Sequence, residues 1–148
     1  ETCRLGLCRS RDLARAIREA LEAGGFDLDR LGGLDIGISG CPNTCAGQRV
    51  AGIGLQGVLR RVDGRPVPHY AIELGGRTGE GKTRLGARIG VLPARDVPAF
   101  LVAFLRAFVE SRECPDFDAF LDAGGFERAR RLAEANEQGV RMICEAGG

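Results

Sequence analysis

The chain has 148 residues, which one domain of ordinary size accounts for, and its 44% hydrophobic and 28% charged residues are typical of globular proteins. Its net charge of +1, from 21 basic and 20 acidic side chains, argues against a nucleic acid or a membrane surface as partner. No run of 18 apolar residues is present, which argues against a membrane-spanning helix.

The first predicted element is a helix over about residues 11–23, where apolar residues recur at 3–4 spacing. Ser10 is expected to cap its N-terminus, and Gly24-Gly25 to end it. The next segments carry alternating apolar residues, which is typical of strands. In chain order they are residues 34–38, 50–62, 69–74 and 85–91. Asp63-Gly64 predicts a turn that joins the second and third of them into a hairpin.

The last third of the chain is predicted to be helical. Asp96 and Pro98 mark the start of a helix with one broad apolar face, which Cys114-Pro115 ends. Two further helices are expected over about 117–123 and 127–136. This order of elements indicates an α+β fold, a small mixed β-sheet with flanking helices, in a single domain over the whole chain.

The six cysteines are many for this length. Without a secretory signal we expect a cytoplasmic protein, in which metal or catalytic roles are favoured over disulfides. Cys3 and Cys8 are spaced C-x4-C, and Cys41 and Cys45 are spaced C-x3-C. Sulfur ligands suit zinc or an iron–sulfur cluster, and spacings wider than the C-x2-C of structural zinc sites favour the cluster. The alternative is a small buried apolar side chain. That interpretation is preferred for the two unpaired cysteines, Cys114 and Cys144.

The segment Ser39–Gln48, SGCPNTCAGQ, is the most informative run in the sequence. It resembles the second cysteine motif, GCPN[ST]CA, of the siroheme-dependent nitrite and sulfite reductase family. Downstream, Val50–Gly57 resembles the family's ADIGLxG strand and Tyr70–Gly76 its YxIxLGG strand. Upstream, Thr2–Gly6 resembles the CPGTxTCxLG signature. The resemblance covers nearly the whole chain and is weakest toward the C-terminus.

The resemblance implies the fold of the family's [4Fe–4S] and siroheme-binding domain, together with its ligands. Matched position by position, Cys3 is the second cluster ligand, Cys41 the third and Cys45 the fourth, and Cys45 is also the axial ligand of siroheme iron. The first ligand would lie four residues before Glu1, so we expect the sequence to be a fragment of a longer chain. Cys8 as a substitute for that ligand stays open as an alternative.

Asn43 and several arginines are further candidates for cofactor contact. Asn43 can donate a hydrogen bond to a sulfur or a siroheme carboxylate, or it is a simple turn residue. The arginines near the cysteines are placed to contact siroheme carboxylates, or else they are solvated: Arg4, Arg9, Arg11 and Arg49. No catalytic residue is expected in this chain, because in the family the residues that grip substrate come largely from the preceding half of the protein.

The function that the resemblance implies is to hold a [4Fe–4S] cluster coupled to siroheme for six-electron reduction of sulfite to sulfide or of nitrite to ammonia. The implied partners are an electron donor (ferredoxin or a flavoprotein subunit) and the remaining half of the reductase. One alternative is a cofactor-free fragment without activity, since we expect the isolated chain to bind no siroheme and little iron. Another is the family's relative in cobalamin synthesis.

Residues 76–83 also match the phosphate-binding pattern G-x4-G-K-[ST]. That loop requires a helix to begin at Lys82, and the glycines and Pro93 that follow make a poor helix. We therefore predict a surface turn here, and nucleotide binding is a distant alternative.

Overall fold

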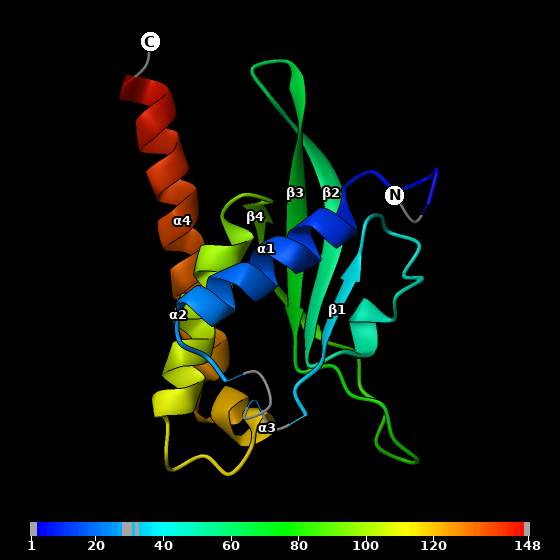
Figure 1. The fold of residues 1–148 in the computed structure, drawn as a ribbon, viewed down its shortest axis with the longest axis vertical. Helices are drawn as coiled ribbons and strands as arrows, with labels where there is room; N and C mark the ends of the chain where they lie inside the picture. Colours follow the sequence, from blue (N-terminus) through cyan, green and yellow to red (C-terminus); the bar gives the residue numbers. More distant parts are fainter. Residues whose placement is uncertain (1–2, 28–30, 32, 147–148) are drawn as a thin grey trace.

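The computed structural model describes the backbone of residues 3–27, 31 and 33–146, and side chains as far as residue 136. The elements in chain order are α1 (Ser10–Ala23), β1 (Ile36–Ser39), the 3-10 helix η2 (Gln48–Val50), β2 (Ile53–Val62), β3 (Arg65–Leu74), β4 (Ala87–Pro93), α2 (Val97–Glu110), α3 (Phe117–Phe120), η3 (Leu121–Gly125) and α4 (Phe126–Ala146). The predicted α+β architecture, a mixed sheet flanked by helices, is confirmed (Figure 1).

The sheet has four strands in the order β1-β2-β3-β4. β1 runs parallel to β2, whereas the β2–β3 and β3–β4 pairs are antiparallel. The predicted turn joins β2 to β3, and Asp63 and Gly64 both take positive φ, 49° and 76°, as a two-residue hairpin turn requires. The far end of this hairpin projects beyond the rest of the sheet (Figure 1).

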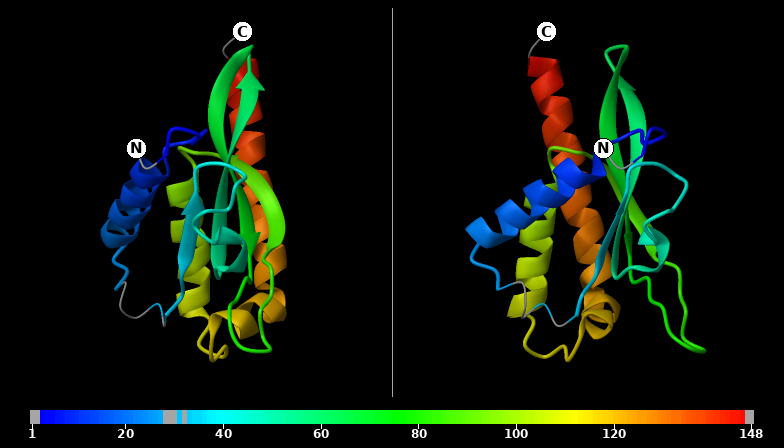
Figure 2. Two further views of the ribbon diagram at one scale, coloured as in Figure 1. Left: turned by 90° about the vertical axis from the view of Figure 1, so that its right-hand side faces the viewer. Right: turned by 45° about the vertical axis from the view of Figure 1, so that its right-hand side comes forward.

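Helices α1, α2 and α4 gather on one side of the sheet, and the core lies between the two layers (Figures 1 and 2). Alternate residues of β2 and β3 are fully buried there, among them Ile53, Leu55, Ile72 and Leu74. The apolar face predicted for α2 packs against them through Phe100, Leu101, Phe104 and Leu105. Each such side chain contributes about 1.5–3 kcal/mol by leaving water, so this contact between the layers stabilises the fold substantially.

Several predicted boundaries are wrong. Ser10 is the first helical residue and not the cap, since Arg9 holds that position with no side-chain cap hydrogen bond. β3 begins at Arg65, although Pro66 and Pro68 follow. These prolines are tolerated because the pairing of β3 with β4 begins only at position 69, so this part of β3 is an edge and needs no donor on that side.

The C-terminal helices also differ in length from the prediction. α2 ends at Glu110, before Cys114, because Ser111 leaves the helical conformation. The helix expected over 127–136 continues as α4 to Ala146.

Candidate functional site

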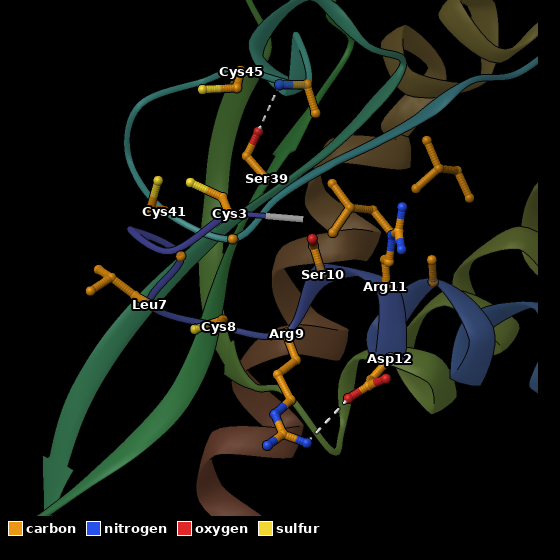
Figure 3. Close-up of a pocket in the computed structure, with 16 residues that line it drawn as sticks. Cys3, Leu7, Cys8, Arg9, Ser10, Arg11, Asp12, Ser39, Cys41 and Cys45 are labelled. Carbon is orange, nitrogen blue, oxygen red and sulfur yellow. Dashed lines mark hydrogen bonds and ion pairs between the residues drawn. The ribbon is translucent and has the colours of Figure 1, made fainter. Parts of the chain in front are cut away.

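A cavity of about 880 Å³ lies beside the N-terminus of α1, where the chain segment before the helix meets the end of β1 (Figure 3). The loop that follows β1 forms the rest of its wall. Four cysteines from two distant stretches of sequence line this one cavity: Cys3, Cys8, Cys41 and Cys45.

Glycines allow the two cysteine-bearing segments to approach so closely. The backbone N–H groups of Leu7 and Cys8 both donate to the carbonyl oxygen of Gly40, at 3.0 and 2.9 Å. A Cβ at Gly40 would lie 2.5 Å from the carbonyl oxygen of Cys8, and a Cβ at Gly57 of β2 would lie 2.5 Å from that of Gly40. Only residues without a side chain permit this packing, so the sequence fixes the contact between the segments through its glycines.

The loop between Cys41 and Cys45 contains a strained turn. Thr44 has φ +56°, a conformation that is uncommon for a β-branched residue and costs about 1–3 kcal/mol. Gly47 follows with φ +63°, and its N–H donates to the Thr44 carbonyl at 2.9 Å. The turn leaves the Cys45 side chain exposed, while Cys41 is buried.

The sulfurs of this site have the chemistry that a soft metal centre requires. Cys3 and Cys45 are exposed, and the N–H of Leu5 points to the Cys3 sulfur at 3.4 Å, as an amide donor to a thiolate would. Within the stretches that the structure describes, no three His, Cys, Asp or Glu side chains are gathered closely enough to hold a single metal ion. A cluster of several irons is wider than one ion, so its ligands can stand farther apart. The donor set fits such a cluster in chemistry, and its cysteines line one cavity.

Cys8 lies on the same cavity but its thiol is engaged elsewhere. Its Sγ donates to the backbone carbonyls of Val58 and His69, at 3.6 and 3.7 Å, which belong to β2 and β3. Burial raises the pKa of this thiol above its ordinary value of 9.0. A protonated thiol is a poor metal ligand, so these contacts weigh against Cys8 as a substitute for the first ligand of the family pattern.

The raised pKa of Cys8 predicts a loss of stability in alkali. The folded chain keeps the thiol proton at pH values where the unfolded chain has released it. The stabilisation is therefore complete below about pH 9 and is lost as pH rises further. We expect the free energy of unfolding in urea to fall by at most about 1.4 kcal/mol per pH unit from this thiol, and the slope to be shallower in Cys8→Ala. Equal slopes in the two proteins would contradict the assignment.

The other predicted site residues lie outside the cavity wall or at its rim. Asn43 and Arg49 are exposed and do not line the cavity; the Arg49 carbonyl accepts from the N–H of Gly86 at 2.7 Å. Arg9 and Arg11 do line it, and Arg9 forms an ion pair with Asp12 at 3.6 Å. Their contacts to a cofactor stay predictions.

Two polar residues that the sequence analysis did not single out are buried behind the cysteine loop. Ser39 and Gln48 are 5% and 0% exposed, and Ser39 also lines the cavity. Both stand at the ends of the SGCPNTCAGQ run, and that position was the only signal in the sequence that marked them.

Two further sequence features lie apart from the site. No helix begins at Lys82; Thr83 donates to the Gly79 carbonyl within a turn between β3 and β4, so the predicted surface turn is confirmed. Cys114 is partly buried beside Ser111 and does not line the cavity. The side chain of Cys144 is outside the described residues.

Sequence comparison finds named relatives for about half of the chain. It is 40% identical over 77 residues, 52% of its length, to a ferredoxin–nitrite reductase of Synechococcus elongatus. It is 35% identical over 85 residues, 54% of its length, to the ferredoxin sulfite reductase 2 of Mycolicibacterium paratuberculosis. The matches span only 14% and 15% of those proteins. No protein-family model matches the sequence.

The fold has a solved counterpart. The structure of the Mycobacterium tuberculosis NirA protein superimposes with a TM-score of 0.73 and 24% sequence identity, over 86% of this chain and 24% of that one. Across the described residues, no helix has both the length and the apolar character needed to cross a membrane.

Proposed function

Because this chain is a domain of the nitrite/sulfite reductase family, we propose that it holds a [4Fe–4S] cluster coupled to siroheme for the six-electron reduction of nitrite or sulfite. The observation that carries the proposal is the position of Cys3, Cys41 and Cys45 on one cavity, although Cys41 follows Cys3 only after the intervening residues 4–40. Cysteines that serve only as small apolar side chains of a core would not be expected to gather on a solvent-accessible cavity.

In this proposal the three thiolates hold the cluster, and Cys45 also faces siroheme. When bound, the cluster and siroheme supply one-electron transfer and activation of the oxyanion. The exposure of Cys45 suits a sulfur shared between two groups, because one side of it is free of protein. The Leu5 N–H donates toward the Cys3 sulfur, where it would stabilise the negative charge of a thiolate ligand and would raise the potential of a cluster held there.

The charge around the cavity suits an anionic cofactor. The N-terminus of the 14-residue helix α1 lies at the cavity, where its free N–H groups favour negative charge. Arg9 and Arg11 lie there too. We assign to them the siroheme carboxylates, with Arg49 and Asn43 as contacts that would need the loop or a neighbouring domain to close over the cofactor.

The partners follow from the relatives' names. Both nitrite and sulfite reductases are among them, so the substrate is either oxyanion, and all are named as ferredoxin-dependent. We therefore favour ferredoxin over a flavoprotein subunit as the electron donor, with the rest of the reductase supplying the substrate-binding residues. The described cysteines are all free thiols, which suits a cytoplasmic protein.

Anaerobic reconstitution tests the proposal on the chain as it stands. The protein is incubated with ferrous iron, sulfide and a small thiol that fills the remaining ligand position, then desalted and analysed for iron and sulfide. We expect about four irons and four sulfides per chain, with broad visible absorption. A sample alkylated with iodoacetamide before reconstitution is the control and should stay colourless. Equal iron in both samples, or none in either, would favour a cofactor-free fragment instead.

A further inference from the structure

A buried hydrogen-bonded pair lies directly behind the cysteine loop. The Ser39 hydroxyl donates to Oε1 of Gln48 at 2.5 Å, and its oxygen accepts from the backbone N–H of Ala46 at 3.2 Å. Figure 3 shows the second of these contacts, which reaches from the end of β1 to the peptide that follows Cys45. Ser39 thus connects the end of β1 both to the buried Gln48 and to the cysteine loop, the loop that carries Cys41 and Cys45.

Two glycines of the sheet allow the backbone of Gln48 to pack directly against it. Gly37 of β1 and Gly54 of β2 are register partners, so they lie side by side on the sheet face away from the helices. A Cβ at Gly37 would lie 2.8 Å from the Cα of Gln48, and a Cβ at Gly54 would overlap its carbonyl oxygen. The backbone of Gln48 is therefore pressed against the sheet, and its side chain, with no exposed surface, can reach Ser39.

Ser39 and Gln48 contact a loop whose backbone is strained at Thr44. The left-handed Thr44 persists only where surrounding contacts hold it. Besides a weak contact in which the Cys45 Sγ donates to the Asn43 carbonyl at 3.8 Å, two backbone N–H groups of the loop are hydrogen-bonded. The Gly47 N–H donates to the Thr44 carbonyl from within the loop, and Ser39 accepts the Ala46 N–H from outside it. Cys45 lies between these two anchored points, so the direction of its side chain depends on both.

We propose that Ser39 and Gln48 are positioning residues that fix the Cys45–Ala46 peptide and so set the direction and accessibility of the Cys45 thiol. The role of the Cys45 thiol as a ligand rests on the proposed function. The contacts of Ser39 and Gln48, in contrast, are present in the chain without any cofactor. Ser39 supplies the contact to the loop, and Gln48 orients the Ser39 hydroxyl so that its lone pair faces the Ala46 N–H.

The test compares four variants of the cofactor-free protein: Ser39→Ala, Ser39→Thr, Gln48→Met and, as matched control, Ser10→Ala. Ser10 lines the same cavity, but it caps nothing. Hydrogen exchange of the Ala46 amide and the rate at which iodoacetamide modifies Cys45, relative to Cys3, are measured by mass spectrometry of peptides. We expect exchange of this amide to rise about tenfold in Ser39→Ala and Gln48→Met, and the Cys45 to Cys3 rate ratio to change severalfold. Ser39→Thr, which keeps the hydroxyl, and Ser10→Ala should match wild type.

The outcomes separate this proposal from the proposed function. If Ser39→Ala fails to fold, Gln48→Met decides, since methionine keeps the volume and removes only the polar contact. Exchange of the Ala46 amide and modification of Cys45 within twofold of wild type in a folded variant would overturn the positioning role, even if the chain takes up iron. The expected changes in a chain that takes up no iron would sustain the positioning role and reject the cofactor.

Discussion

Replacing Cys45 with serine is expected to lower the iron retained after anaerobic reconstitution at least tenfold. Serine keeps the size and the exposed position, but its hydroxyl is a hard ligand that does not ionise near neutral pH, whereas the cluster requires a soft thiolate. Cys41→Ser should have the same effect. Iron and sulfide per chain, with visible absorption as a second measure, report the result.

Two other cysteines provide matched controls for this experiment. Cys114→Ser removes a thiol that does not line the cavity, and Cys8→Ser removes one whose Sγ faces backbone carbonyls of the sheet. Both variants should retain iron as wild type does. Loss of iron in Cys8→Ser, in a variant that remains folded, would show that Cys8 is a ligand after all and would restore the C-x4-C pairing.

Substituting Gly57 by alanine is expected to destabilise the fold and disrupt the site together. The new Cβ would lie 2.5 Å from the Gly40 carbonyl oxygen and 3.0 Å from the Cys8 Cβ. Because the Gly40 carbonyl accepts from Leu7 and Cys8, both cysteine-bearing segments would have to move off β2. We expect a loss of about 3 kcal/mol in the free energy of unfolding, measured in urea, and of most of the retained iron.

The matched control for that substitution is Gly79→Ala, in the loop between β3 and β4. A Cβ there would meet only the Lys82 Cβ at 3.6 Å, an ordinary contact. The free energy of unfolding should change by less than about 0.5 kcal/mol. A Gly57→Ala protein as stable as Gly79→Ala would mean that the two segments are not held against the strand as described.

The sequence predicts most of the secondary structure because its signals are local. The apolar spacing of α1 and the Asp63-Gly64 turn need no information from distant residues, and both are confirmed. The start of β3 was missed because two prolines normally exclude a strand, and only the position of β4 explains why they are tolerated. The end of α4 is predicted too early because Asn136 and Gly139, both unfavourable inside a helix, lie within it.

The candidate site is only partly predictable, because contacts between residues far apart in the sequence leave no local signal. The loop that carries Cys41 and Cys45 is recognisable from SGCPNTCAGQ, which is a contiguous run. The spacing of Cys3 and Cys8 suggested a pair, yet the Cys8 thiol turns toward Val58 and His69, 50 and 61 residues away. The contact between Ser39 and Gln48 depends on the register of β1 against β2, which no local pattern records.

The parallel pairing of β1 with β2 restricts the length of the segment that joins the two strands. Parallel neighbours need a crossover of a dozen or more residues, usually a helix, and here residues 40–52, with the cysteine loop and η2, serve that purpose. Adding or deleting one residue would either strain this connection or shift β2, and a shift would turn Ile53 and Leu55 out of the core. The length of the loop that carries Cys41 and Cys45 is therefore tied to the packing of the core, so insertions or deletions between β1 and β2 are expected to destabilise the whole domain.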